Sequence, residues 1–301
     1  MASKELVTTN KTMHGVTSVH RLILVGITIQ LAIFSIIFGS IDLLSTNHLI
    51  FITVLIVLIG LPHGALDILV SKEAQIYKGI LGFTLFHLGY VATAISVFIL
   101  WLFAPVVSLV LFLLLSAWHF SCDWRETYNG LQRMLFGITL LSIPSLFFPE
   151  QISQIYSVLS GEDARIIMEF QRAICPAAVI LSIASLVFNK SAHAIDIVCL
   201  YVLAATQHPI IFFAFYFCAY HSILHFTREL DNFSHYADRV RYPVVILYSI
   251  LAILVTTPLL LSIFTSSLVS DVVISQIFIG LAALSLPHIC LIEFKQRYSR
   301  T

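Results

Sequence analysis

The sequence predicts an all-α, polytopic integral membrane protein of about 8–10 transmembrane helices, with a metal site built between them. Of its 301 residues, 59% are hydrophobic and only 11% are charged, whereas soluble domains usually carry about 25% charged residues. The apolar residues form one long run after another, and histidines recur near the ends of these runs. So few charges cannot cover a water-facing surface, so we expect a lipid bilayer to surround the chain.

The apolar runs are separated by brief polar breaks, and most approach the length of a spanning helix. Such a helix needs about 20 apolar residues, or about 17 at the short end. The first run follows a polar N-terminus and is a full span rather than the short apolar stretch of a signal peptide. The predicted spans are residues 22–41, 49–69, 80–103, 105–120, 131–148, 173–188, 194–207, 209–226, 243–265 and 272–294.

The segment 194–226 is the hardest to divide, because it is too long for one helix and short for two. Proline removes a backbone donor from a helix, and Pro209 interrupts this segment. Two short helices and a re-entrant pair both remain open. The connection 149–172 is the one long loop, and its Ile152, Ile155, Tyr156 and Leu159 predict a short amphipathic surface helix.

Charge indicates the orientation of the chain. Basic loops alternate with neutral or acidic ones, and cytoplasmic loops carry the excess of lysine and arginine. We therefore expect a multi-pass protein of the inner (plasma) membrane with both termini in the cytoplasm. The predicted domains are an N-terminal tail, 1–21, a single transmembrane domain, 22–294, and a C-terminal tail, 295–301. Sixteen basic and 16 acidic residues balance, so nothing suggests nucleic acid as a partner.

Histidines within the spans carry the functional signal, because ionisable groups inside a membrane are costly and usually functional. On the predicted topology, five histidines that are far apart in sequence lie at one depth, toward the cytoplasmic leaflet. The i, i+4 spacing of two of them places both rings on one helix face. This shared depth predicts a metal site built from His63, His119, His221, His225 and His288.

Two carboxylates follow histidines by four residues. A metal-bound histidine usually donates its second N–H to a carboxylate or carbonyl. We expect this role for Asp67, which follows His63, whereas Asp123, which follows His119, fits an interfacial charge equally well.

The remaining histidines are weaker candidates. His87 either joins the site or packs, and His208 lies near the opposite face, so it stays outside the metal shell. We expect those in tails or loops to face water: His14, His20, His48, His193 and His235.

Imidazole ligands suit zinc, copper, iron and nickel. A neutral histidine set with open positions suits a divalent iron that binds dioxygen, whereas a structural zinc has no evident purpose here. An aromatic stretch runs into the histidine pair and is either plain packing or the wall of a tunnel for a flat, apolar ligand. The candidate tunnel residues are Phe213, Tyr216, Phe217 and Tyr220.

Four motifs together resemble the Brp/Blh family of bacteriorhodopsin-related membrane proteins, which are β-carotene 15,15'-dioxygenases. They are GLPHGALD at 60–67, WHF followed by an acid at 118–123, YFCAYHSILHF at 216–226 and LPHICLIEF at 286–294. The motifs span most of the chain in the family's order. Two departures leave the role of Asp123 open: Ser121 replaces a glycine, and the acid falls one residue early.

This resemblance implies a membrane dioxygenase that uses Fe(II) and O2 to cleave the central double bond of β-carotene into two all-trans-retinals. It implies His63, His119, His221 and His225 as iron ligands, and leaves His288 as a further ligand, a support or a substrate contact. A functional link to a retinal-binding rhodopsin would follow. The alternative is a histidine-rich transporter or opsin-partner protein without cleavage activity, although a transporter often shows repeat symmetry, which we do not find.

Overall fold

The computed structural model describes residues 2–38, 46–161, 163–189, 191, 193–233, 236, 238–265 and 269–298, and helices joined by short loops make up most of them. Within these residues no strand occurs, which confirms the predicted all-α class. The first half contains α1 (Ala2–Phe38), α2 (Thr46–Leu55), η1 (Ile56–Gly60), η2 (Leu61–Leu66), α3 (Asp67–Glu73), α4 (Gly79–Phe103), α5 (Pro105–Ser121), η3 (Cys122–Trp124) and α6 (Gly130–Phe147). The second half contains α7 (Pro149–Ser160), α8 (Arg165–Phe188), α9 (His193–Thr206), α10 (Pro209–Ala214), η4 (Phe215–Ser222), α11 (Ile223–Asn232), α12 (Asp238–Thr265) and α13 (Val269–Tyr298).

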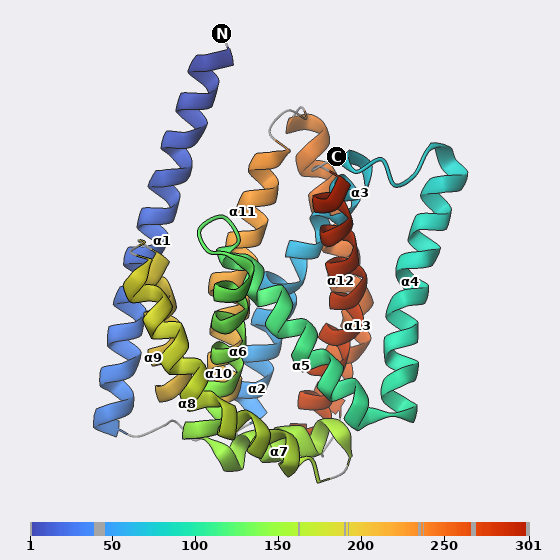
Figure 1. The fold of residues 1–301 in the computed structure, drawn as a ribbon. Coiled ribbons are helices and arrows are strands. Elements are labelled where there is room, and N and C mark those ends of the chain that lie inside the picture. The colour runs from blue at the N-terminus through green and yellow to red at the C-terminus, as the bar shows by residue number, and fades with distance from the viewer. Residues whose placement is uncertain are drawn as a thin grey trace.

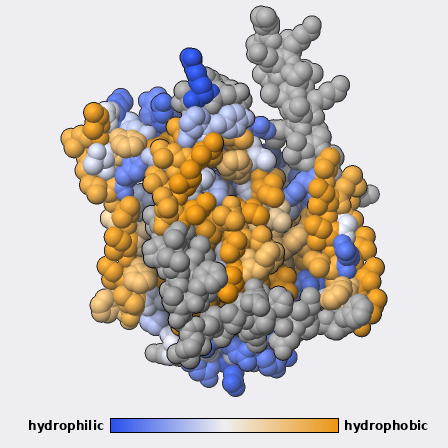
Figure 2. Space-filling model, turned by 180° about the vertical axis from the view of Figure 1, so that it is seen from behind, coloured by the Kyte–Doolittle hydropathy of each residue, from blue (hydrophilic) through white to orange (hydrophobic). Residues whose placement is uncertain are grey.

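Among the described residues, eight helical stretches are long and apolar enough to cross a membrane, and two shorter apolar helices accompany them. Figure 2 shows hydrophobic side chains over the middle of the visible face and hydrophilic ones gathered at its two ends. Apolar side chains on this surface match the lipid tails. The helices are suited to lipid as well, because a helix satisfies its backbone hydrogen bonds internally. The protein is a multi-pass membrane protein, as its composition predicted.

The helices run up and down between the two ends of one bundle (Figure 1). Both chain termini lie on the same side, and α7 crosses the opposite end. Buried Ile152, Ile155, Tyr156 and Leu159 form one face of α7. This confirms the amphipathic helix predicted in the long loop.

The structure divides the segment 194–226 into two elements. Helix α9 ends at Thr206, and His208 caps α10 by accepting the backbone N–H of Ile210 on Nδ1, at 3.3 Å. Pro209 is the first residue of α10, where its missing N–H costs nothing. From there α10, η4 and α11 continue as one 24-residue span to Asn232. The segment therefore contains two separate helical stretches, of which α9 is the short one.

The helix α1 begins well before the predicted span, at Ala2. The end of the predicted tail packs into the bundle, where Arg21 forms an ion pair of 2.7 Å with the buried Asp196 of α9. His20 and His193, which we expected to face water, are instead half-buried and hydrogen-bonded: His20 Nε2 donates to Ala219 O at 2.8 Å, and His193 Nδ1 contacts Asp196 Oδ2 at 3.1 Å. The side chains of His14, His48 and His235 lie outside the described residues.

Candidate functional site: a histidine cluster at the junction of two apolar cavities

The fold brings four of the five predicted histidines together from four elements of the bundle. His119 lies in the last turn of α5, His221 lies in η4, His225 follows in α11, and His288 lies in α13. The ring centroid of His119 lies 4.7 Å from that of His221 and 5.4 Å from that of His288. His225 lies 5.0 Å from His288 and 6.3 Å from His221. Residues up to 169 positions apart in sequence thus form one cluster of imidazoles.

Two ring nitrogens face each other at the centre of this cluster. His119 Nε2 and His221 Nε2 are 3.0 Å apart, and both side chains are buried. Two imidazole nitrogens that bind one metal at about 2.1 Å and at right angles are separated by about 3 Å. The facing pair therefore has the spacing of two neighbouring metal ligands.

Asp123 orients His221 from behind. Its carboxylate accepts a hydrogen bond from His221 Nδ1, with distances of 2.9 and 3.1 Å to its two oxygens, and another from the Tyr216 hydroxyl at 2.7 Å. An Nδ1–H held by a carboxylate leaves Nε2 as the lone-pair nitrogen of a neutral ring. The interfacial reading of Asp123 is wrong, because this side chain is buried at 4% exposure.

Asp67 holds His288 in the same way. Its carboxylate accepts from His288 Nδ1 at 2.7 Å and from the Tyr90 hydroxyl at 2.8 Å. The sequence spacing had paired Asp67 with His63 and Asp123 with His119. The structure shows that the two carboxylates bond to histidines of other helices, His288 and His221, because the bundle brings these helices together at one level.

An unusual helix geometry carries the central histidine. Residues 215–222 form a π-helix, η4, in which the Tyr216, Phe217 and His221 rings stack. Such π-bulges are rare and frequently occur at functional sites. A second π-helix, η1, packs on η4 at Gly60, where an added Cβ would overlap the Phe217 ring. Glycine at the start of the first motif therefore allows the two irregular helices to touch.

The side chain of His63 lies outside the described residues, so the structure does not place this predicted ligand. Its backbone lies in the 3-10 helix η2, directly after Gly60 and before Asp67. The two ring nitrogens of His87 bond to residues outside the cluster. Its Nδ1 donates to Phe83 O at 2.8 Å, and its Nε2 accepts from the Tyr248 hydroxyl at 2.9 Å.

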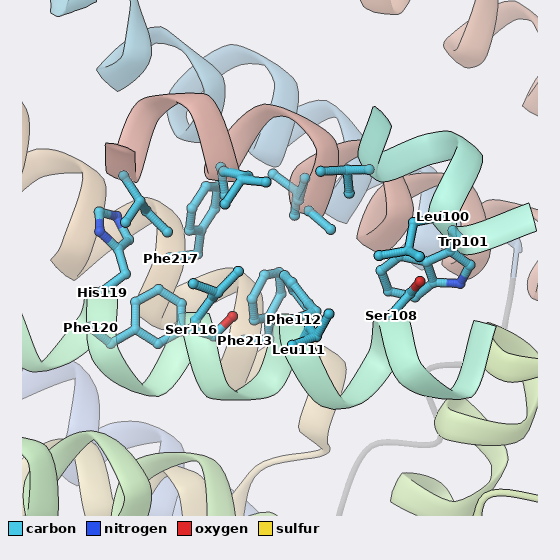
Figure 3. Close-up of a pocket in the computed structure, with 17 residues that line it drawn as sticks. Leu100, Trp101, Ser108, Leu111, Phe112, Ser116, His119, Phe120, Phe213 and Phe217 are labelled. Carbon is cyan, nitrogen blue, oxygen red and sulfur yellow. The ribbon is translucent and has the colours of Figure 1, made fainter. Parts of the chain in front are cut away.

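Two apolar cavities reach the cluster. The larger, of about 510 Å³, follows α4 and α13, includes His288 and Phe217 in its lining, and borders α12. The smaller, of about 80 Å³, follows α5 from His119 and Phe120 at one end to Leu100 and Trp101 at the other (Figure 3). Phe217, Leu281 and Ser285 line both cavities, so the two meet beside the histidines.

The predicted tunnel residues divide into two pairs. Phe213 and Phe217 line the smaller cavity, where Figure 3 shows both rings facing the space along α5. Tyr216 and Tyr220 lie outside the linings of both apolar cavities, and are buried around the carboxylate side of the cluster. Tyr216 donates to Asp123, and the Tyr220 hydroxyl accepts from Trp124 Nε1 at 3.1 Å. The stripe therefore combines a cavity wall with a scaffold for His221.

The chemistry of this donor set fits a divalent metal, although the described side chains do not complete a site by themselves. Among them, no group of three or more histidine, cysteine, aspartate or glutamate residues is arranged to hold an ion. The facing nitrogens of His119 and His221 and the carboxylates behind His221 and His288 are nevertheless the features of histidine metal ligands. His63 is the further ligand that its sequence motif implies.

A multi-span helical bundle with buried imidazoles at the junction of two apolar cavities defines a membrane protein that acts on an apolar molecule. A family model described as β-carotene 15,15'-dioxygenase matches residues 54–295. The chain belongs to this family. A β-carotene 15,15'-dioxygenase of the uncultured marine bacterium 66A03 is 28% identical over 257 residues, which cover 80% of this chain and 91% of that protein. No solved structure matches the chain.

Proposed function

We propose that this protein cleaves the central 15,15' double bond of β-carotene with O2 and releases two molecules of all-trans-retinal. The observation that carries the proposal is the facing pair of His119 and His221, 3.0 Å apart, beside the two apolar cavities. A metal centre at this place would border two apolar cavities that suit an apolar substrate. The family match supports the same activity.

The residues of the chain prepare the site for Fe(II), with His63, His119, His221 and His225 as its ligands and His288 beside them. When bound, the iron supplies the redox chemistry that lets dioxygen react with a carbon–carbon double bond. Asp123 and Asp67 keep the Nδ1 protons of His221 and His288 in place, so that Nε2 of each ring carries the lone pair. This pre-set tautomer avoids reorganisation when the metal binds.

The larger cavity suits a carotenoid. Its lining is mainly aliphatic and aromatic, from α4, α12 and α13, and among its polar groups Asp67, Tyr90 and His288 belong to the hydrogen-bonded part of the cluster. β-carotene is too apolar to cross water, so it enters from the lipid around the bundle. Each aldehyde product takes one oxygen atom of O2, so the reaction consumes no external reductant.

The charge distribution supports a plasma-membrane location with both termini in the cytoplasm. Lys72, Arg125 and Lys295 lie at or near helix ends on the side of the bundle that carries the termini (Figure 1). Basic residues concentrate on the cytoplasmic side of membrane proteins. Retinal released into this membrane would be available to a retinal-binding rhodopsin, which we propose as a functional partner.

Coexpression in a bacterium that accumulates orange β-carotene tests the proposal. The wild type should bleach the cells and form retinal, whereas His63→Ala and His221→Ala should leave the colour when they are expressed equally. Off-centre apocarotenals in place of retinal would refute central cleavage. Persistent colour with well-expressed wild type and available iron would favour the transporter or opsin-partner alternative.

A further inference from the structure

A third cavity also reaches the histidine cluster, and many charged side chains line it. It measures about 340 Å³ and begins at His119, His221 and His225. Its remaining walls come from η3 and the loop that follows it, from α11 and from α13, near the end of the bundle that carries the termini. We call this cavity the vestibule. Its charged lining residues are Asp123, Arg125, Glu126, Arg228, Glu229, Glu293 and Lys295.

Ion pairs hold the walls of the vestibule. Arg125 Nη2 donates to Glu293 Oε1 at 2.8 Å and joins the loop after η3 to α13. Lys295 Nζ donates to Glu229 Oε2 at 2.7 Å and joins α13 to α11. Both pairs tie together the helices that carry the histidines. Charged walls retain water, because dehydrating them without compensation is costly.

We propose that the vestibule is the aqueous entrance through which a hydrated divalent cation reaches the imidazoles, separate from the apolar route of the carotenoid. This inference rests on the proposed metal-dependent function. A hydrated cation cannot pass the two apolar cavities, because an isolated charge pays a large desolvation cost there. Four carboxylates line the vestibule, three of them held by ion pairs or hydrogen bonds, and they give the cation a hydrated, acidic path to His119 and His221.

Cys122 provides a built-in probe of this entrance. It lines the vestibule, with Sγ 2.9 Å from Arg125 Nη2. A negatively charged methanethiosulfonate should modify it in lipid vesicles that contain the Cys290→Ser protein, since Cys290 is otherwise exposed. The Cys122→Ser variant of the same protein should stay unmodified, because the other thiols are buried: Cys175, Cys199 and Cys218. A Cys122 that reacts only after denaturation would overturn the proposal.

Metal exchange measures the passage itself, by metal content and without catalysis. Metal-free protein is mixed anaerobically with Fe(II), and its iron content is followed over time, as is extraction by a water-soluble chelator. Modified Cys122 should slow uptake and extraction at least about tenfold and leave the final iron content unchanged. Asn232→Trp, which narrows the vestibule at the end of α11 without touching the histidines, should do the same.

The outcomes separate the two proposals. Unchanged exchange rates in both altered proteins, with normal final iron content, would refute the entrance and leave the metal-dependent function standing. A wild-type protein that binds no iron would refute the metal centre and the entrance with it. Slower exchange at constant iron content supports the entrance, because a merely damaged site would lose metal.

Discussion

Replacing Asp123 by asparagine removes the charge behind His221 while it preserves the shape of the side chain. The carboxylate accepts from both His221 Nδ1 and the Tyr216 hydroxyl, and it is buried. An amide has one acceptor oxygen and one donor nitrogen, so a hydrogen-bond donor replaces one of the two carboxylate oxygens that face His221 Nδ1. His221 Nδ1 lies within 3.1 Å of both oxygens, so the amide nitrogen meets Nδ1 in either orientation. This contact favours the tautomer with the proton on Nε2, where the metal should bind.

The expected loss follows from this arrangement. Mutations of such supporting carboxylates typically cost about 10–100-fold in metal affinity or activity, or about 1.4–2.7 kcal/mol. Tyr216→Phe removes only one donor and keeps the charge, so we expect a smaller loss, of about 1 kcal/mol. Retinal formed per milligram of membrane protein and iron content after purification measure both effects.

A matched control distinguishes orientation from general damage. Asp196 is also a buried carboxylate, paired with Arg21 and His193 away from the cluster. Asp196→Asn should lower thermal stability and leave iron affinity unchanged in the folded fraction. Wild-type iron affinity and turnover in well-folded Asp123→Asn would show that this carboxylate does not set the tautomer of His221.

Three further perturbations test the packing of α5 on α6, the hydrogen bond from His20 to Ala219 O in η4, and the metal. Gly137→Ala should cost about 1–3 kcal/mol of stability, because a Cβ would overlap Ala117 O where α5 packs on α6; an unchanged melting temperature in detergent would contradict this. His20→Ala should cost about 1 kcal/mol and lower retinal formation by loosening the π-helix at Ala219 O, whereas His20→Gln, which keeps an N–H donor, should restore activity. Chelator treatment of the purified protein should abolish cleavage and Fe(II) should restore it; full activity after verified metal removal would exclude the metal centre.

Much of the fold could be predicted because lipid imposes simple rules on a sequence. A span must be long, apolar and helical, so the run 80–103 matched α4 within one residue at its start. The amphipathic pattern around Tyr156 likewise predicted α7. Helix ends were less certain: α8 begins at Arg165, eight residues before the predicted span, because polar residues can extend a helix beyond the apolar run.

The sequence by itself determined the membrane class and the four histidine-bearing motifs, because composition and spacing along one helix are local properties. The tertiary structure alone decided which groups meet. Asp123 pairs with His221 across 98 positions and Asp67 with His288 across 221, which the spacing of each acid four residues after a histidine did not indicate. It also turned Tyr216 toward a carboxylate and Phe217 toward the cavities. Such choices depend on how helices pack and rotate against one another, which no pattern within a single helix records.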